Sequence, residues 1–384
     1  MGKNMVLITY DQYPNGNAGA VRQHVFAKAY MELGYTVTVI GMGISTQFAF
    51  SEFEGVKYIS LRHEKTDALH KIQNKLLYKK KLKKILKSVC ADAVMVIDIP
   101  LCAMQMVKKY TKKKNIPLIH DSVEWYSKEE FALRGFDHNY LHKDALNRRV
   151  INQDFRVIAI SSYLQKHFEK KGIMTRRIPF VFDVANIAYE KELDKEKIAI
   201  VYAGSMGKKD YFAQIIDGLS LLLPEELSKF EFRILGITRE GFINLQGDCH
   251  KKLEYIGNAL QFLGRVPRET VIEHLKEASF TILLRPDNLR YAKAGFPTKV
   301  SESLTYGTPV ITNLTSDLHL YLKDGVNSLI AESLSAESVA KTLRRALALD
   351  GKTRQEMCYA ARETAEKELD YRQFQAALEE LAVP

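Results

Sequence analysis

Residues 280–312, FTILLRPDNLRYAKAGFPTKVSESLTYGTPVIT, carry the pattern that decides the fold. Two apolar runs of strand length, residues 280–284 and 309–312, flank a helical pattern that opens at Pro297. Proline suits a first helical position because the N–H group that it lacks would have no partner there. Gly307 ends the helix, and the next apolar run follows at once. This order predicts a strand, a helix and a second strand of a parallel sheet.

The same alternation of short apolar runs and longer amphipathic stretches fills the 384-residue chain, which predicts the α/β class. The chain exceeds the size at which one core usually divides into two. A charged run at residues 189–197 separates two series of strand candidates, and we interpret it as an interdomain linker. We therefore predict an N-terminal domain at residues 1–183 and a C-terminal domain at residues 184–365. A final helix at about residues 366–384 is expected to pack back onto the first domain.

Several classes of protein are excluded by the apolar runs and the cysteines. The longest apolar runs are strand-sized, well short of the roughly 20 residues that cross a bilayer. Residues 5–10 form a strand-like segment near the start of the chain, without the features of a signal peptide, so we expect a cytoplasmic protein. The four cysteines lie far apart without a Cys-x-x-Cys pair, which indicates neither a disulfide framework nor a zinc site.

A glycine-containing loop follows the first strand candidate and leads into a helical pattern at about Val21. The free N–H groups of a helix N-terminus bind anions, and Gly16 and Gly19 would let the backbone approach a phosphate or a sugar closely. The spacing is not that of dinucleotide-binding folds, so a plain turn between strand and helix also fits. Gly16 and Gly19 are candidates for donor binding.

The helix that opens at Pro297 offers the chemistry of a nucleotide site. The N–H groups of Thr298 and Lys299 have no partner within the helix and could bind a diphosphate. Glu302 lies one turn further on, where its carboxylate could accept hydrogen bonds from ribose hydroxyls. We therefore expect Pro297, Thr298, Lys299 and Glu302 to bind the donor.

At this point the C-terminal half resembles glycosyltransferase family 4. Residues 302–310 match the second half of the family's Glu-x7-Glu motif and the Gly-Thr-Pro-Val that follows it. Ala294 stands where the first glutamate falls, and the Phe-Pro-Thr-Lys of residues 296–299 marks a variant of the pattern. Residues 18–22, 117–121 and 202–210 also resemble family segments, so the resemblance extends over nearly the full length.

The resemblance implies the GT-B fold, in which two Rossmann-like domains face each other across a cleft. It also implies a retaining transferase that moves a sugar from a nucleotide diphosphate sugar to a polysaccharide, glycolipid or lipid-linked acceptor in cell-surface glycan synthesis. Neither a protein nucleophile, a metal ion nor a cofactor is expected. A nucleotide-sugar epimerase of similar fold and a basic module that only binds nucleotide-sugar or nucleic acid are the alternatives.

Site residues follow from the resemblance position by position. His120 is expected to contact the donor sugar near its reacting carbon. Lys209 is the second catalytic candidate, because a fixed cation stabilises the charge that develops on the leaving diphosphate. Arg22 and Glu124 are candidates for acceptor contact. Ser205 stands at the family's usual arginine, and further donor contacts are expected from Lys208, Lys209 and Arg290.

Positive charge is concentrated in one part of the chain, whose formal net charge is +10. Residues 62–114 hold 15 Lys or Arg against 4 Asp or Glu, and residues 71–87 (Lys71 to Lys87) read as a basic amphipathic helix. Anionic lipid attracts such a surface by about 1 kcal/mol per nearby cation, which suggests a peripheral position at the inner face of the plasma membrane. A solvated helix that packs its apolar stripe on the sheet explains the pattern as well. No nucleic-acid partner is expected.

Overall fold

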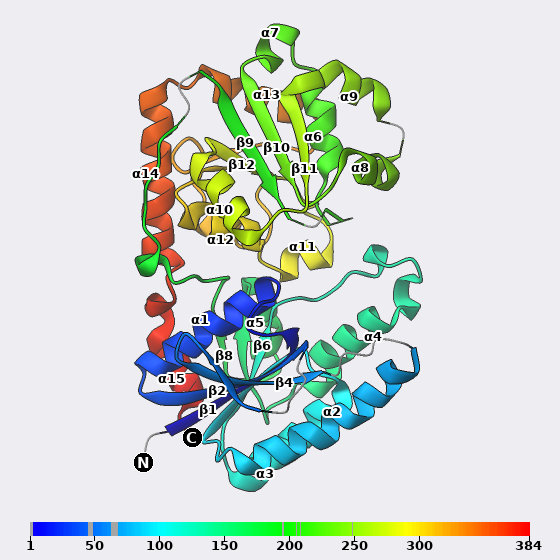
Figure 1. Cartoon of the computed structure of the whole chain (residues 1–384), viewed down its shortest axis with the longest axis vertical. Coiled ribbons are helices and arrows are strands. Elements are labelled where there is room, and N and C mark those ends of the chain that lie inside the picture. The colour runs from blue at the N-terminus through cyan, green and yellow to red at the C-terminus, as the bar shows by residue number, and fades with distance from the viewer. Residues whose placement is uncertain are drawn as a thin grey trace. The chain divides into compact units, whose positions relative to one another are not determined.

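The computed structural model describes residues 3–44, 49–62, 68–193, 196–204, 206–207, 209–247 and 249–384. The chain divides into two compact units, each built around its own sheet (Figure 1). Unit 1 comprises Met1–Phe182 and Tyr371–Pro384, and unit 2 comprises Asp183–Asp370. The boundary predicted after residue 183 lies beside the first transition, and the predicted returning helix overlaps the segment that rejoins unit 1.

Unit 1 contains an eight-stranded sheet in the order β3-β4-β2-β1-β5-β6-β7-β8. All neighbours are parallel except the β3–β4 pair. Central strands such as β5 are buried along their whole length, because helices cover both faces of a parallel sheet. The strands are β1 (Lys3–Gln12), β2 (Tyr35–Ile44), β3 (Ser51–Phe53), β4 (Val56–Arg62), β5 (Ala93–Ile97), β6 (Leu118–Ser122), β7 (Arg156–Ala159) and β8 (Thr175–Arg177).

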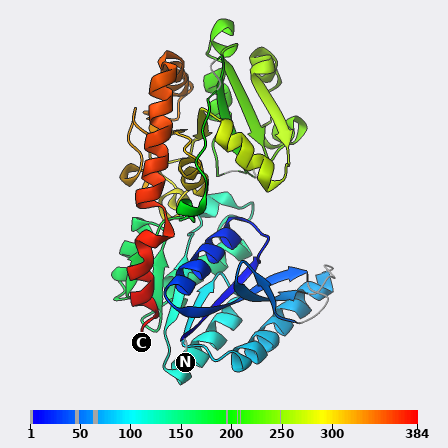
Figure 2. The same ribbon diagram turned by 60° about the vertical axis from the view of Figure 1, so that its left-hand side comes forward.

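The C-terminal helix of the chain lies beside the first helix of unit 1 (Figures 1 and 2). Tyr30 Oη donates to the carbonyl of Leu378 at 3.2 Å, and Gln375 Nε2 donates to Glu32 Oε2 at 2.6 Å. Tyr30, Leu378 and Leu381 belong to one buried cluster. The helices of this unit are α1 (Ala18–Glu32), α2 (Ala68–Ser88), α3 (Leu101–Lys114), α4 (His138–Ala145), α5 (Ser162–Glu169) and α15 (Gln375–Ala382), with short turns η1 (Lys128–Glu130), η2 (Arg134–Phe136), η3 (Leu146–Val150) and η7 (Tyr371–Phe374).

Unit 2 contains a six-stranded parallel sheet in the order β11-β10-β9-β12-β13-β14. The strand–helix–strand unit expected at residues 280–312 is present, with Ile282 of β12 paired to Ile311 of β13. Its strands are β9 (Ile198–Ala203), β10 (Phe230–Leu235), β11 (Leu260–Gly264), β12 (Phe280–Leu283), β13 (Val310–Thr312) and β14 (Ser328–Ile330). Its helices are α6 (Phe212–Leu219), α7 (Pro224–Leu227), α8 (Arg239–Gln246), α9 (His250–Ile256), α10 (Arg268–Glu277), α11 (Arg290–Ala294), α12 (Thr298–Thr305), α13 (Ala336–Ala348) and α14 (Gly351–Glu368), with turns η4 (Val184–Asn186), η5 (Gly257–Ala259) and η6 (Leu318–Leu320).

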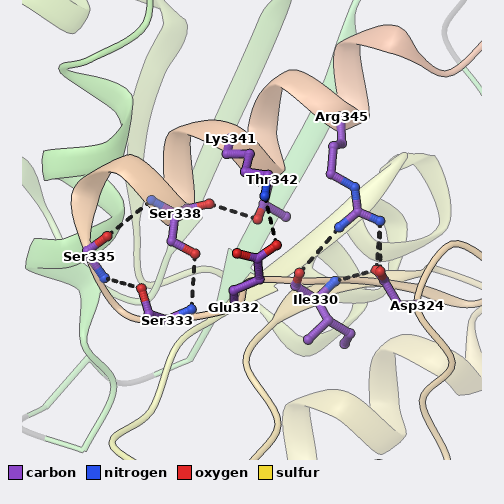
Figure 3. Close-up of polar contacts among 9 residues, drawn as sticks. All are labelled: Asp324, Ile330, Glu332, Ser333, Ser335, Ser338, Lys341, Thr342 and Arg345. Carbon is purple, nitrogen blue, oxygen red and sulfur yellow. Dashed lines mark hydrogen bonds and ion pairs between the residues drawn. The ribbon is translucent and has the colours of Figure 1, made fainter.

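Polar contacts fix α13 against the edge strand β14 (Figure 3). Ser335 caps the helix, because its Oγ accepts the N–H of Ser338 at 3.2 Å. Two turns later, Arg345 Nη2 donates to both carboxylate oxygens of Asp324 at 2.9 Å, and its Nη1 donates to the carbonyl of Ile330 at 3.3 Å. The Asp324 carboxylate also accepts the N–H of Ile330. The short strand β14 is therefore held by the Arg345 and Asp324 hydrogen bonds to Ile330 as well as by its ladder.

The charged run interpreted as a linker belongs to unit 2. Lys191 Nζ donates to the Thr308 hydroxyl at 2.6 Å and to the Leu275 carbonyl at 3.0 Å. The ring of Tyr189 occupies the space beside Gly307, where an added Cβ would lie 2.2 Å from Tyr189 Cε2. Gly307 also has a positive φ of 66°. The chain therefore passes from unit 1 to unit 2 before this run, and its residues Tyr189 and Lys191 pack on the end of α12.

We expect Gly307→Ala to destabilise the protein more than Gly325→Ala does. Both glycines have positive φ, but a Cβ at Gly325 would meet nothing within 4 Å. The left-handed backbone costs about 1–2 kcal/mol for each alanine, and the Tyr189 overlap should add about 1–3 kcal/mol at Gly307. Denaturant unfolding measures both, and Tyr189→Ala should remove the added cost in the double variant. Equal losses at the two glycines would contradict this account.

Candidate functional site

Three side chains in unit 2 converge on the carboxylate of Asp210, which is 5% exposed. Asp210 Oδ2 accepts hydrogen bonds from Tyr202 Oη and Lys299 Nζ, each at 2.7 Å. Asp210 Oδ1 accepts from Arg285 Nε at 2.9 Å. These donors come from β9, from the segment after β12 and from the first turn of α12. The carboxyl ends of neighbouring parallel strands form the edge where α/β sheets bind ligands, and this cluster lies at the ends of β9 and β12.

The cluster has more positive than negative charge. Burial alone would raise the pKa of Asp210, but Lys299 and Arg285 hold it well below its ordinary value. Burial lowers the pKa of Lys299, and the Asp210 carboxylate opposes that shift. One carboxylate thus faces two cationic side chains, so one positive charge remains for an anion. Burial raises the pKa of the Tyr202 phenol, which therefore stays neutral.

The backbone makes room for Lys299 in this cluster. A Cβ at Gly204 would lie 2.6 Å from Lys299 Cε, so a side chain at this position would displace the lysine. Gly204 has a φ of 140°, which side chains rarely tolerate. Lys299 Nζ lies 4.9 Å from the centre of the Tyr202 ring, in the range of a cation–π contact. Residues of β9 and of the turn after it therefore fix the position of the ammonium group.

The predicted helix N-terminus is present next to the cluster. Helix α12 begins at Thr298 after the N-cap residue Pro297, and no side chain caps it. The N–H of Val300 donates to the carbonyl of Pro297 at 2.9 Å, so the N–H groups of Thr298 and Lys299 are the ones available to an anion. Glu302 forms an ion pair with Arg268 of α10 through Oε1, and its side chain is 15% exposed. Arg268 was not predicted from the sequence. Because Glu302 pairs with this cation, one of its two carboxylate oxygens is already bound.

The remaining donor candidates of unit 2 lie around the same turns. The carbonyl of Lys209 accepts a hydrogen bond from Tyr291 Oη at 3.0 Å, and Lys209 Nζ lies 5.9 Å from the Tyr291 ring centre. Arg290 is the first residue of α11 and is partly exposed. Ser205 and Lys208 lie outside the described residues. Lys209 directly precedes Asp210 in the chain, and its contacts with Tyr291 of α11 fix its position.

Arg22 of unit 1, which is expected to contact the acceptor, is buried, and that role stays a prediction. Its side chain is 2% exposed and forms two parallel hydrogen bonds with Asp121, from Nε at 2.7 Å and from Nη2 at 2.9 Å. It also donates to the carbonyls of Ile178 and Pro179. This buried pair is a structural connection between α1 and β6, and the guanidinium offers no surface to an acceptor.

The two loop glycines of unit 1 lie where a side chain would overlap other atoms of the same loop. A Cβ at Gly16 would lie 2.3 Å from the carbonyl oxygen of Gln12, and a Cβ at Gly19 would lie 2.4 Å from Asp11 Oδ2. The N–H of Gly19 already donates to Asn17 Oδ1 at 2.8 Å. Close packing therefore explains both glycines, and the expected donor contact stays a prediction.

His120 is fully buried on β6, and neither ring nitrogen makes a hydrogen bond of good geometry among the described residues. Burial, reinforced by the Lys143 cation, lowers its pKa to about 4. The imidazole is therefore neutral at pH 7 and has no open surface, so contact with a sugar requires a local opening. Glu124 is partly exposed and bonds the Tyr126 phenol. The catalytic role of His120 and the acceptor role of Glu124 stay predictions.

Sequence reasoning missed Asp210 and Arg285, although both lie inside segments that it singled out. The available signal was local: Arg285 directly follows the run at residues 280–284, and Asp210 directly follows a candidate cation. Their pairing joins positions 75 residues apart, so no short motif contains it.

The second unit matches one family model. Residues 183–364 match the model of Glycosyl transferases group 1. This match covers unit 2 almost completely and supports a glycosyltransferase. No curated protein sequence matches the chain significantly. Among the described residues, no helix is long and apolar enough to cross a membrane, and no group of three or more His, Cys, Asp or Glu side chains could hold a metal ion.

Solved structures with a similar fold match nearly the whole chain. A sucrose-phosphate synthase from Thermosynechococcus elongatus has a TM-score of 0.75 at 13% identity, covering 99% of this chain and 98% of that one. WaaG, a glycosyltransferase involved in lipopolysaccharide biosynthesis, has a TM-score of 0.68 at 17% identity, covering 98% and 99%. Anabaena HepE in complex with UDP-glucose has a TM-score of 0.68 at 14% identity, covering 98% of both chains. The predicted GT-B fold of two Rossmann-like domains is confirmed.

Asp210→Asn should destabilise the protein by about 3–5 kcal/mol, because it leaves the buried Lys299 and the Arg285 cation without their partner. The pKa of Asp210 is lowered on folding, so its contribution is fully present above the unfolded value of 3.8 and is lost as the pH falls towards the folded value. Denaturant unfolding should show a constant difference from wild type above about pH 5 and a shrinking one below pH 4.

The control for this prediction is Asp217→Asn, which removes a carboxylate from an exposed pair with Lys252 in the same unit. It should change the free energy of unfolding by about 1 kcal/mol or less. A pH-independent difference for Asp210→Asn would contradict the assignment of the lowered pKa to this carboxylate.

Proposed function

We propose that the protein is a retaining glycosyltransferase of family 4, which transfers a sugar from a nucleotide diphosphate sugar to an acceptor in cell-surface glycan synthesis. The observation that carries the proposal is the cluster of Arg285 and Lys299 around Asp210, with its surplus positive charge beside the uncapped N-terminus of α12. It lies in the unit that matches Glycosyl transferases group 1. The similarity to a structure that holds UDP-glucose supports a nucleotide-sugar donor.

The donor diphosphate binds against Arg285, Lys299 and the first-turn N–H groups of α12 in this proposal. Arg285 uses only Nε towards Asp210 among the described contacts, which leaves its two terminal nitrogens for phosphate oxygens. Ser205 replaces the arginine that the family commonly has, and Arg285 supplies that guanidinium from the neighbouring strand. Glu302, held by Arg268, directs its second oxygen to the ribose hydroxyls.

Transfer needs no protein nucleophile in this proposal. The bond between the sugar carbon and the diphosphate oxygen breaks while the acceptor oxygen forms a bond to the same face of that carbon. The acceptor's proton goes to the departing phosphate oxygen. The leaving diphosphate gains negative charge, and the fixed cations Arg285, Lys299 and Lys209 stabilise it. These side chains and the end of α12 take the place of a metal ion.

The surface of unit 1 favours a lipid-linked acceptor at an anionic membrane. On α2, Leu82, Ile85 and Leu86 are buried, so the apolar stripe of this helix packs on the unit itself. Lys79, Lys80, Lys83, Lys84 and Lys87 remain exposed. The side chains of residues 68–76, including Lys71 and Lys75, lie outside the description. Attraction to lipid is therefore expected to come from charge rather than from insertion of this helix.

Apolar side chains near α4 add to this surface. Phe136 is 89% exposed, and Leu133 and Leu141 are 67% and 51% exposed. These three exposed apolar side chains lie within nine residues of the chain. Contact with the apolar part of an acceptor or with lipid would cover them.

Nucleotide binding tests the donor site. In a thermal-shift panel of UDP, GDP, ADP, TDP and CMP, one nucleoside diphosphate should stabilise the protein by roughly 2.7 kcal/mol at 100 times its dissociation constant. Arg285→Ala, Lys299→Ala and Glu302→Ala should each weaken that binding by about 1–3 kcal/mol, because each removes a bond to a charged group. Calorimetry measures the loss.

The matched control for these variants is Arg344→Ala, which removes a cation from the surface pair with Glu226 in the same unit. It should leave affinity unchanged. Unchanged nucleotide affinity in all three site variants would contradict the proposed donor site. Release of free nucleoside diphosphate only when an acceptor is supplied would separate the transferase from an epimerase.

Neutralising Lys79, Lys80, Lys83 and Lys84 to glutamine should abolish salt-sensitive binding to vesicles that contain anionic lipid. Each lysine near the surface contributes about 1 kcal/mol, so sedimentation with vesicles should show a large loss. A control variant neutralises four exposed lysines of unit 2 and should bind like wild type. Those lysines are Lys251, Lys323, Lys352 and Lys367. Equal binding to neutral vesicles would contradict the charge-based attraction.

A further inference from the structure

The segment after β12 carries Arg285, whose guanidinium is part of the proposed donor site. Strand β12 ends at Leu283, and residues 284–289 form neither a strand nor a helix before α11 begins at Arg290. Pro286 follows Arg285 and disfavours a helical conformation at the residue before it. The backbone of Arg285 is therefore expected to be extended, with its N–H and C=O directed at a neighbouring strand. The contacts that hold this backbone decide where the guanidinium lies.

The side chain of Asn313 binds both polar groups of that backbone. The N–H of Arg285 donates to Asn313 Oδ1 at 3.0 Å, and Asn313 Nδ2 donates to the carbonyl of Arg285 at 2.7 Å. Asn313 is 7% exposed, so water competes little for these two bonds. The partners also determine which way the amide points, because an N–H needs the amide oxygen and a carbonyl needs the amide nitrogen. One buried side chain thus makes two hydrogen bonds to the residue that carries the cation.

Asn313 continues the pairing of β12 with β13 beyond the end of the main-chain ladder. The last pair of that ladder joins Leu283 to Thr312, and Asn313 is the next residue of the chain. Backbone N–H and C=O groups that are buried need partners, and here a side-chain amide supplies them instead of another strand residue. The carboxyl ends of parallel strands are the edge where α/β sheets bind ligands. The amide therefore acts at the edge of the sheet where the donor site is proposed.

A second set of contacts holds the same segment from the direction of β9. The sheet order β9-β12-β13 places the segment after β12 between the segments that follow the other two strands. The N–H of Tyr211 donates to the carbonyl of Leu284 at 2.8 Å, and Arg285 Nε donates to Asp210 Oδ1 at 2.9 Å. The Asp210 contact orients the guanidinium, and Asn313 fixes the backbone from which that side chain projects. An arginine side chain has many conformations, so both ends have to be held to keep it in one place.

We infer that Asn313 is a positioning residue of the donor site, which holds the Arg285 guanidinium where it binds the diphosphate. The inference rests on the proposed function, since Arg285 meets a diphosphate only there. Asn313 acts through Arg285, because its two bonds end on the backbone of that residue. A displacement of about 1 Å in such a clamp is enough to reduce its effect strongly.

A double-mutant cycle on the full chain tests the inference through nucleotide affinity. The probe is whichever of UDP, GDP, ADP and TDP binds wild type most tightly in calorimetry. Arg285→Ala should weaken that binding about fivefold or more, because it removes a bond to a charged group. Asn313→Ala should weaken it about threefold or more by displacing the same group. The double variant should bind within about twofold of Arg285→Ala alone, because the two residues act as one unit.

Two results of the cycle would overturn the inference. Losses that add in the double variant would mean that Asn313 acts on the nucleotide without Arg285. Unchanged affinity in a folded Asn313→Ala protein is the result expected if the amide only stabilises the fold. Asn313→Ser replaces the amide with a shorter hydroxyl side chain, and it carries the same cycle with the same expected coupling if the alanine variant does not fold.

Asn327→Ala is the matched control, because Asn327 forms the same kind of bridge elsewhere in unit 2. It is 2% exposed, its Oδ1 accepts the N–H of Lys323 at 2.7 Å, and its Nδ2 donates to the carbonyl of Tyr321 at 2.9 Å. Both alanine variants should lower the denaturant midpoint, because each takes partners from backbone groups. Asn327→Ala should leave nucleotide affinity unchanged. A loss of affinity equal to that of Asn313→Ala would mean that a general loosening of the unit explains both, against the positioning role.

Wild type and Arg285→Ala separate this inference from the proposed function. Nucleotide binding that Arg285→Ala weakens and Asn313→Ala does not would reject the positioning role and leave the donor site in place. Absence of nucleotide binding by wild type would reject the proposed function and, with it, the inference that rests on it.

Discussion

The carboxylate of Asp210 holds together three segments of unit 2 that are far apart in sequence. It accepts hydrogen bonds from Tyr202, Arg285 and Lys299, and it is almost completely buried. A buried carboxylate is costly unless cations and donors surround it, so the fold has to bring these groups to one point. The end of the Lys299 side chain lies in the space that a Cβ at Gly204 would fill. The position of both cations thus depends on one acidic residue.

Each unit pairs a carboxylate with cations near the carboxyl ends of its strands. In unit 2, one carboxylate orients two cations, and the remaining positive charge favours a diphosphate in the proposed function. In unit 1, the carboxylate of Asp98 pairs with Lys143. The buried partner differs between the units, because Lys143 is 3% exposed and Asp98 35%, whereas Asp210 is 5% exposed and Lys299 22%. Burial therefore fixes the cation in unit 1 and the carboxylate in unit 2.

The sequence predicted the parallel α/β architecture because strands buried on both faces read as continuous apolar runs, as at residues 93–97 and 198–203. Strands β3, β8 and β14 escaped detection because each has three residues and includes polar ones. The start of α12 at Thr298 could be predicted from Pro297, a local signal. Asp210 could not be recognised as the centre of the site, because its partners are 75 and 89 residues away. Motifs identify helix ends, whereas tertiary packing decides which side chains meet.

The His-Asp pair of β6 shows how one motif serves two faces of a sheet. His120 and Asp121 are consecutive strand residues, so their side chains point to opposite faces. Asp121 binds Arg22 of α1 and is fully buried on one side. On the other side, His120 is fully buried, and the charges that act on it are those of Lys143, Asp98 and His142. The two residues therefore cannot act as one catalytic pair. Asp121 fixes the helix that follows the first loop, while burial and Lys143 lower the pKa of His120 and keep its imidazole neutral on the opposite face of the sheet.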